Sequence, residues 1–569
     1  MSAQARREVL ASLTSPGSAY EVVERQMPDG NVRRIVPSAP DTLLDLLANT
    51  AKFGDYEYIC YRDEVYTFAD VLDQTARLAG ALSRLGVQRG DRVAICMRNF
   101  PEWPAAFFAP MALGAVTVSL NGWWSGEEIA YGLRDAGATT LIADGGRLER
   151  IESQLAELGV QAIAVRCDRS SPSENVRHWD QVLGESSGSP LHWVPISADD
   201  DCLMLYTSGS TGGPKAAIST HSNVVHALMG WEIEHRAQAM LRGDPIPEEP
   251  FDKQFRMLVT IPLFHVTACH VCMLTALRFG RRLTLMHKWD ADEAIEIIDR
   301  ERITHFISVP TITGDLVRTA EARGRMLPSL LAVGGGGSHR PANQVLAIPE
   351  VLENAQPGTG WGMTETNAIG TQIGPPDYLR VPASSGRCSV LMDMKIVNPE
   401  DGREVEPGGT GELWVRGSPV VRGYWNKPEA TARAFQDGWF RTGDLAYVDE
   451  EEFIYFVDRI KDIVIRGGEN ISCLKVEDAL YQCEGVAEAV AFGIPDERLG
   501  EELAAVVVPR KGAQLSADRL CIEMERHLGR FEVPTSIVFQ DTPLPRIATG
   551  KFAKRRIREA VLSRINNGR

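Results

Sequence analysis

The strongest constraint on the fold is a regular alternation of amphipathic and apolar segments between residues 67 and 165. Residues 67–86 read TFADVLDQTARLAGALSRLG. Thr67 and Asp70 form a capping pair, the apolar residues line one face, and Gly86 supplies a stop, so the segment predicts a helix. The apolar runs RVAICM, AVTVSL, TTLIAD and VQAIAV follow, separated by further helical patterns. Such alternation predicts a doubly wound, largely parallel sheet with helices on both faces.

The alternation of helical and strand patterns resumes at RMLVTIPL, RRLTLM and ITHFISVP. After Arg380 the helical patterns give way to short β-rich runs. The runs DMKIVN, GELWVRG and FIYFVDR, divided by tight turns, predict a β-barrel-like subdomain at about 381–460. Mixed helical and strand patterns from Lys461 onward predict a separate α+β domain. The predicted fold class is therefore α/β, with a large N-terminal domain of doubly wound sheets at 1–460 and a small C-terminal domain at 461–569.

Composition excludes several classes of protein. The chain has 569 residues with 44% hydrophobic and 24% charged, which is typical of a globular, soluble protein of more than one domain. A net charge of −16 gives no electrostatic case for nucleic-acid binding. The ten cysteines are scattered, which indicates reduced thiols and a cytoplasmic location. Residues 103–126 lack charge, but Pro104, Pro110 and Gly114 interrupt them, so they predict a short helix and a buried strand and no transmembrane span.

A glycine- and hydroxyl-rich loop, YTSGSTGGPK, covers residues 206–215 and ends in Lys215. Glycines allow backbone N–H groups to point into one concavity, while hydroxyls and a lysine add donors for anionic oxygens. The loop lacks the spacing of the nucleotide-triphosphatase loop. On its own it is either a surface linker or a phosphate-binding loop.

Four other segments carry groups suited to nucleotide chemistry. GWGMTET places Glu365 beside Thr364, and a carboxylate near phosphates is typical of a magnesium site, although an exposed acidic turn has the same pattern. WFRTGDLAYVD places Asp444 after a tight turn, where it can accept from ribose hydroxyls. DRIKDIVIRGGENIS holds Arg459, Lys461 and two adjacent glycines, and PRIATGKFAKRRI presents Lys551 after a glycine.

These segments, in this order, resemble the adenylate-forming superfamily of acyl-CoA synthetases, adenylation domains and luciferases. The resemblance extends from TFADV at residue 67 to Lys551 and covers nearly the whole chain. One local departure is Trp361, where many members carry tyrosine; both residues offer a flat aromatic face for adenine.

The resemblance implies a set of residues for the first half-reaction, in which a carboxylate and ATP form an acyl-AMP and pyrophosphate. Thr364 would contact the α-phosphate, and Glu365 would hold Mg²⁺. Lys551 would bridge the carboxylate and α-phosphate oxygens as they bond. The remaining ATP-binding residues would be Thr207, Ser208, Gly209, Ser210, Thr211, Gly212 and Lys215 at the phosphates, Gly335, Gly336 and Trp361 at adenine, and Asp444 and Arg459 at ribose.

The resemblance also implies a second half-reaction, in which a thiol attacks the acyl-AMP. The C-terminal domain would be mobile and would rotate about Lys461, so that Lys551 leaves and Gly467 and Gly468 line the tunnel for CoA. His265 would lie between the carboxylate site and the thiol tunnel; a structural histidine is the alternative. The implied acyl pocket consists of His226, Met229, Gly230, Val266 and Met363.

We therefore expect an ATP-dependent acyl-CoA synthetase, an AMP-forming acid–thiol ligase that uses ATP, Mg²⁺ and CoA. The expected acid is fatty, alicyclic or aromatic, because the pocket candidates include no partner for a second charged group. An acyl-AMP ligase that loads a free-standing carrier protein is the alternative, and a non-catalytic nucleotide-binding relative is a third. The expected partners are small molecules; weak membrane contact and a homodimer stay open.

Overall fold

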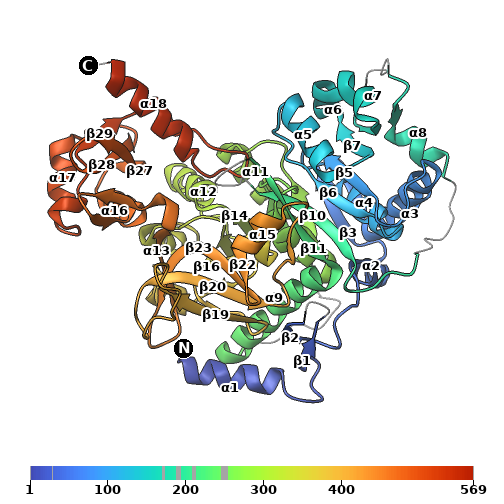
Figure 1. Ribbon diagram of the computed structural model, residues 1–569, viewed down its shortest axis with the longest axis horizontal. Coiled ribbons are helices and arrows are strands. Elements are labelled where there is room, and N and C mark those ends of the chain that lie inside the picture. Colours follow the sequence, from blue (N-terminus) through green and yellow to red (C-terminus); the bar gives the residue numbers. More distant parts are fainter. Residues whose placement is uncertain are drawn as a thin grey trace.

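The computed structural model describes residues 2–27, 30–168, 173–186, 194–207, 213–244 and 254–567, with side chains to 564 (Figure 1). Within these residues the strands form two large mixed sheets, a smaller antiparallel sheet, a C-terminal sheet and two short two-stranded pairs. The chain thus has the predicted α/β fold, in which a large N-terminal part carries a small C-terminal α+β domain.

The first sheet has eight strands in the described residues and contains the predicted alternation. From β10 to β9 the neighbouring strands run parallel, and β11 and β21 continue the sheet antiparallel. The order is β21 (Gly423–Tyr424), β11 (Lys215–Thr220), β10 (Asp201–Thr207), β6 (Val116–Ser119), β5 (Arg92–Cys96), β7 (Thr140–Asp144), β8 (Gln161–Val165) and β9 (Val176–His178).

Alternate residues of the central strand β5 face two separate hydrophobic cores. Val93 and Ile95 pack into one cluster with α3 (Phe68–Arg84) and α4 (Trp103–Ala112). Ala94 and Cys96 pack into the other with α5 (Gly126–Ala136) and α6 (Gly145–Ile151). Since successive side chains of a strand point to opposite faces, this confirms the sheet with helices on both faces.

The predicted helix boundaries come from local capping. Thr67 accepts from the Asp70 N–H, the Asp70 carboxylate accepts from the Thr67 N–H, and Gly86 follows the helix with φ +88°. Ser125 and Glu128 form the same reciprocal cap on α5. Each such cap stabilises a helix by about 1 kcal/mol. The uncharged run at 103–126 forms the short helix α4 and the buried strand β6, as predicted. No helix in the described part of the chain combines the length and the hydropathy of a membrane span.

The second sheet has seven strands in the described residues, and its central strands are parallel. Its order is β16 (Gln356–Thr359), β15 (Ala332–Gly335), β14 (His305–Ser308), β12 (Arg256–Val259), β13 (Arg282–Leu285), β3 (Glu57–Tyr61) and β4 (Glu64–Thr67). Its helices include α10 (Thr275–Arg278), α11 (Ala291–Glu301), α12 (Pro310–Ala322) and α13 (Ala342–Val351). The three runs predicted to resume the alternation form β12, β13 and β14.

The β-rich region forms an antiparallel sheet, whose strands are β19 (Met392–Val397), β20 (Gly411–Gly417), β22 (Phe435–Gln436), β23 (Trp439–Val448) and β24 (Ile454–Arg459). The long strand β23 pairs with β20, β22 and β24, and the described pairings leave an open path from β19 to β22.

The C-terminal domain contains the long hairpin of β27 (Val486–Asp496) and β28 (Gly500–Pro509). The other strands are β25 (Val464–Arg466), β26 (Glu469–Ile471) and β29 (Ser536–Phe539), and the helices are α16 (Cys473–Gln482), α17 (Ala517–Met524) and α18 (Lys554–Asn567).

The N-terminal segment was not predicted. Helix α1 (Ala3–Leu13) packs on the long helix α9 (His221–Arg242), where Arg6 forms an ion pair with the buried Glu234. Strands β1 (Val23–Gln26) and β2 (Val32–Ile35) form a hairpin near it (Figure 1). The contact that orders this segment lies more than 200 residues away in the chain, so local patterns do not reveal it.

The C-terminal domain docks on α12 and the loop before α13. Arg546 bridges Asp315 of α12 (2.7 Å) and Glu488 of β27 (2.5 Å). His339 Nε2 lies 2.8 Å from Asp478 Oδ1 of α16, and Asn343 donates to the Tyr481 carbonyl at 2.8 Å. These contacts bring the loop that carries Lys551 against the N-terminal domain.

Candidate active site

The predicted site segments gather at the carboxyl ends of neighbouring parallel strands in the seven-stranded sheet. His265 lies beyond the end of β12, Gly335 ends β15, and Trp361 follows β16 by two residues. Open α/β sheets bind ligands at this edge, because the loops there are free to diverge. The sheet topology thus brings together groups that lie up to 96 positions apart in the chain.

Lys551 enters this edge from the C-terminal domain. Its turn has Gly550 at φ +86°, and the Gly550 carbonyl accepts from Thr311 Oγ1 of α12 at 2.7 Å. A Cβ atom placed on Gly337 would lie 3.3 Å from Lys551 Nζ, so the amine reaches the glycine run that follows β15.

Burial and two neighbouring charged groups determine the pKa of Lys551. Its pKa is lowered to about 8: burial lowers it most, the positive charge of Arg459 adds to this effect, and the carboxylate of Asp444 opposes both. Burial and the charge of Lys551 also lower the pKa of His265 to about 3, so this imidazole is neutral. His265 Nε2 is buried and has no hydrogen-bond partner in the described part of the chain, which leaves it able to bind a ligand.

A π-helix, Thr267–Leu274, begins just after His265. π-Helices are rare in proteins, and those that occur are often found at functional sites. Cys269 and Cys272, two cysteines three positions apart, lie on this helix and are buried in the hydrophobic core. Both cysteines pack in this core, and no group of three potential metal ligands occurs among the described residues.

Asp444, Arg459 and Trp361 form one connected unit. Asp444 and Arg459 face each other across β23 and β24, with Arg459 Nε 3.0 Å from Asp444 Oδ1. Trp361 Nε1 donates to Asp444 Oδ2 at 2.9 Å, and its ring stacks on Phe456 at 5.3 Å between centroids. Burial raises the pKa of Asp444, while Arg459 and Trp361 counteract this effect. The unit presents a buried, oriented carboxylate beside a flat aromatic ring.

The two glycines predicted at adenine differ in their surroundings. A Cβ on Gly335 would lie 2.2 Å from Arg340 Nη2, so that side of the strand is closed. A Cβ on Gly336 would meet nothing closer than the Gly360 carbonyl at 3.8 Å. The open side at Gly336 gives a flat ring room to approach the backbone.

Glu365 forms a second unit with residues of the other sheet. Thr364 and Glu365 lie on a short 3₁₀ turn, and the buried Glu365 carboxylate accepts from Tyr424 Oη at 2.8 Å through Oε1. Lys215 Nζ lies 5.4 Å from the centre of the Tyr424 ring. Burial raises the pKa of Glu365, and Tyr424 partly reverses this shift.

This carboxylate fits Mg²⁺. A buried carboxylate with a raised pKa is stabilised by a cation, and Mg²⁺ takes one or two carboxylates while phosphates and water complete its shell. Thr207 and Lys215 are paired at the adjoining ends of β10 and β11. The loop residues between them, Ser208, Gly209, Ser210, Thr211 and Gly212, lie outside the described residues.

The acyl-pocket candidates lie in packed surroundings. His226 is buried, its Nδ1 lies 2.8 Å from the Ser222 carbonyl, and its Nε2 accepts from the Val36 N–H at 3.2 Å, so backbone groups engage both nitrogens. A Cβ on Gly230 would lie 2.5 Å from Ile369. Met229 and Val266 are buried, and Met363 packs against the same core. The pocket role of all five residues stays a prediction.

The residues predicted for the thiol step lie apart from this cluster. Lys461 is exposed on a 3₁₀ turn, Ile460–Asp462. Gly467 and Gly468 form the exposed turn between β25 and β26, with φ +59° and +91°. In this structure, therefore, the C-terminal domain directs Lys551 toward the candidate active site, while the Gly467–Gly468 turn stays exposed away from it.

Sequence reasoning missed Tyr424 and Phe456. Tyr424 lies 59 positions from Glu365, and Phe456 lies 95 from Trp361. Neither residue belongs to a motif, and only the paired strands bring them to their partners. The chain carried no local signal for either role.

The chain is similar to one family of known enzymes. Residues 46–425 match the AMP-binding enzyme family, and residues 475–551 match the AMP-binding enzyme C-terminal domain. The chain is 34% identical to a feruloyl-CoA synthase from Amycolatopsis sp over 86% of this chain and 93% of the relative. It is 30% identical to the long-chain-fatty-acid–CoA ligase FadD13 of Mycobacterium tuberculosis over 87% of this chain and 92% of that protein.

A solved structure shares the architecture. The O-succinylbenzoate CoA synthetase MenE of Bacillus subtilis, in complex with ATP and a magnesium ion, aligns with a TM-score of 0.73 and 26% identity over 90% of this chain and 98% of that chain. Another structure of MenE contains its acyl-adenylate intermediate.

Proposed function

The chain belongs to the AMP-binding enzyme family, and we infer from this that it is an ATP-dependent acyl-CoA synthetase. It is an AMP-forming acid–thiol ligase that uses a carboxylic acid, ATP and CoA as substrates and Mg²⁺ as cofactor. The observation that carries this conclusion is the insertion of Lys551 beside Gly337, at the edge of the sheet where the nucleotide segments meet and where the charges of Asp444 and Arg459 act on it.

We propose the following roles in the first half-reaction. Lys551 lies where the carboxylate of the acid meets the α-phosphorus, and its charge offsets the negative charge that builds up as they bond. Thr364 donates to the same phosphate. Asp444 accepts from the ribose hydroxyls, while Arg459 and Trp361 hold its orientation. Mg²⁺ held by Glu365 supplies positive charge at the phosphates.

The remaining nucleotide contacts are proposed from the family resemblance and from position. Thr207 and Lys215 flank the phosphate loop, and Lys215 would contact the outer phosphates together with the loop residues Ser208–Gly212. Gly335 and Gly336 form the wall beside adenine, where the open side at Gly336 supports close approach.

For the second half-reaction we propose that the C-terminal domain, residues 461–569, rotates on the N-terminal domain, residues 1–460. Lys461 would be the hinge, and Gly467 and Gly468 would replace Lys551 at the site. Their exposure in the Lys551-inserted arrangement supports this proposal. Lys461→Pro would stiffen the hinge and should slow CoA transfer while adenylation persists. Unchanged CoA transfer in this variant would contradict the hinge.

We propose that the acid is apolar: fatty, alicyclic or aromatic. Support comes from the names of the two relatives, which act on a ferulic and a long-chain acid, and from the apolar surroundings of Val266, Met229 and Met363. The neutral His265, whose Nε2 has no hydrogen-bond partner among the described residues, would lie at the junction of acid and thiol.

Location and assembly are further proposals. Ten scattered cysteines support a reducing, cytoplasmic environment. A homodimer and a weak contact with the membrane surface are tested by light scattering and by co-sedimentation with vesicles of neutral and anionic lipids.

The direct test is incubation with ATP, Mg²⁺ and a panel of ferulate, indoleacetate and fatty acids, with and without CoA. We expect AMP and a CoA thioester with at least one acid. Pyrophosphate release without thioester in the presence of CoA would favour loading of a carrier protein. No pyrophosphate with any acid would contradict the proposed function.

A further inference from the structure

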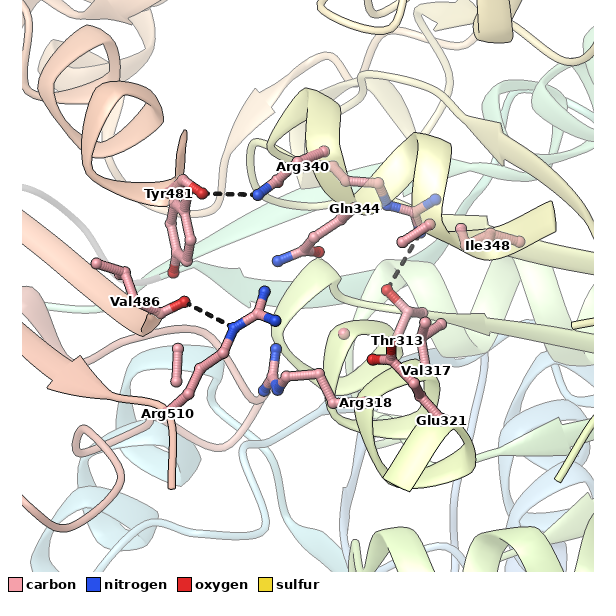
Figure 2. Close-up of a pocket in the computed structure, with 14 residues that line it drawn as sticks. Thr313, Val317, Arg318, Glu321, Arg340, Gln344, Ile348, Tyr481, Val486 and Arg510 are labelled. Atoms are coloured by element: carbon pink, nitrogen blue, oxygen red, sulfur yellow. Dashed lines mark hydrogen bonds between the residues drawn. The ribbon is translucent and has the colours of Figure 1, made fainter. Parts of the chain in front are cut away.

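A pocket lies where the C-terminal domain meets α12 and α13 (Figure 2). Helix α12 contributes Arg318, the segment around α13 contributes Arg340 and Gln344, and the C-terminal domain contributes Tyr481 and Arg510. Because both domains build it, the pocket exists only while the domains are docked with Lys551 inserted. None of its residues takes part in the proposed reaction.

The pocket carries an excess of positive charge. Three arginines, Arg318, Arg340 and Arg510, line it together with one acid, Glu321. Arg318 has a carboxylate partner, Asp315, at 2.5 Å. Within the described ranges of the chain, neither Arg340 nor Arg510 forms an ion pair. Arg340 contacts Thr313 Oγ1 at 3.2 Å, the Val333 carbonyl at 3.5 Å and the side chain of Tyr378, and the exposed Arg510 donates to the Val486 carbonyl at 3.3 Å. Two of the three guanidinium groups thus lack a counter-charge.

Arg340 is the deepest of the three, with 4% of its surface exposed. Its Nε is buried without a hydrogen-bond partner in the described part of the chain, and so is Oε1 of the neighbouring Gln344. A buried cation without a paired anion is costly, and burial accordingly lowers the pKa of Arg340. Of these two groups, the unpaired Nε of Arg340 is a charged donor that suits an anionic ligand.

The other two arginines face one another across the domain boundary. Figure 2 shows the guanidinium groups of Arg318, from α12, and Arg510, from the C-terminal domain, pointing toward each other. Like charges in this position oppose docking. An anion between them would convert the repulsion into two charge-assisted hydrogen-bonded contacts, and the planar forks of guanidinium groups suit phosphate oxygens.

We propose that this pocket binds a phosphate dianion, either free or at the end of a phosphomonoester, and that its binding holds the domains in the Lys551-inserted arrangement. A ligand that binds only one of two conformations shifts the equilibrium toward it. The regulatory consequence rests on the proposed two-step function: bound phosphate retains the adenylating arrangement and slows transfer to CoA.

Arg340 also connects the pocket to the nucleotide site. Its Nη2 lies where a side chain on Gly335 would project, 2.2 Å from a Cβ placed there. An anion that fixes Arg340 therefore fixes the glycine strand on the adenine side as well.

Binding is tested by ³¹P NMR titration with inorganic phosphate and, separately, with glycerol 1-phosphate. A non-hydrolysable ATP analogue and Mg²⁺ are present so that the nucleotide phosphate site is filled. We expect saturable binding to the wild-type protein. Arg510→Gln and Arg318→Gln should each weaken it by about tenfold or more, because each removes one charge-assisted contact.

Arg526→Gln is the matched control, because Arg526 is an exposed arginine of the same domain that does not line the pocket. It should bind phosphate as the wild type does. Equal affinities in Arg510→Gln, Arg526→Gln and the wild type, or no saturable binding at all, would overturn the proposal. Tighter binding of one ligand than the other identifies the source of the phosphate. Since this titration needs no turnover, its result is independent of whether the proposed activity holds.

The conformational part has its own readout. Phosphate should slow thioester formation from supplied acyl-AMP and CoA in the wild type and in Arg526→Gln, and should have a much smaller effect in Arg510→Gln. An equal effect in all three proteins would refute the coupling, even if the pocket binds phosphate.

Discussion

Replacing Trp361 with phenylalanine keeps a flat ring beside the adenine wall and removes only the indole N–H. That group donates to Asp444 Oδ2 at 2.9 Å, and Asp444 is buried. A hydrogen bond to a charged group contributes about 1.5–3 kcal/mol. Its loss corresponds to about a 10- to 150-fold change in an equilibrium constant. Because Arg459 continues to hold Oδ1, we expect the lower end of this range.

The assay is acid-dependent exchange of labelled pyrophosphate into ATP, which reports the first half-reaction alone. In Trp361→Phe, kcat/KM for ATP should fall by about tenfold, while KM for the acid stays close to that of the wild type. Trp361→Tyr tests whether a phenol O–H replaces the indole N–H as donor to Asp444. The refuting result is an unchanged kcat/KM for ATP in Trp361→Phe.

Trp414→Phe is the matched control. Trp414 Nε1 donates to Glu412 Oε2 at the same 2.9 Å, on the five-stranded sheet, and Arg441 continues to hold that carboxylate. Both variants lose one indole–carboxylate hydrogen bond, so both should lose a similar amount of stability. Only Trp361→Phe should lose affinity for ATP; equal ATP kinetics in the two variants would refute the assignment.

Two other variants or conditions test the remaining polar groups. Tyr424→Phe keeps the ring near Lys215 and removes the donor to the Glu365 carboxylate (2.8 Å). The Mg²⁺ concentration for half-maximal adenylation should therefore rise by about tenfold or more. An unchanged Mg²⁺ dependence would contradict the role of Tyr424. Lys551 has a pKa lowered to about 8 and acts as a cation, so kcat/KM for adenylation should fall as the pH rises through about 8, and Lys551→Arg should abolish that decline. A profile that stays level to pH 10 in the wild type would refute this prediction.

Much of the fold could be predicted from local patterns. Capping pairs such as Thr67–Asp70 and Ser125–Glu128 define helix starts without tertiary contacts, and strand β5 is apolar on both faces because it lies between two cores. The N-terminal helix α1 was not predictable in this way, since its place depends on Arg6 reaching Glu234 across 228 positions.

The candidate site likewise contains residues that local motifs predict and residues that only tertiary contacts bring into place. Lys551, Asp444, Arg459, Glu365 and Trp361 stand in motifs, and the structure brings them to one edge of the sheet. The contacts that tune them were not predictable, because Tyr424, Phe456 and Arg340 act through strand pairing and domain docking. The direction of the pKa shift of Lys551 likewise depends on burial by another domain, which no short segment encodes.

The central claim is that one lysine serves only one of two half-reactions, because the C-terminal domain changes place between them. The most direct test is Lys551→Ala, measured separately for pyrophosphate exchange and for thioester formation from supplied acyl-AMP and CoA. We predict that exchange falls by at least about a hundredfold, as for loss of a group that stabilises developing charge, while thioester formation stays within about twofold of the wild type. A similar loss in both half-reactions would contradict the account.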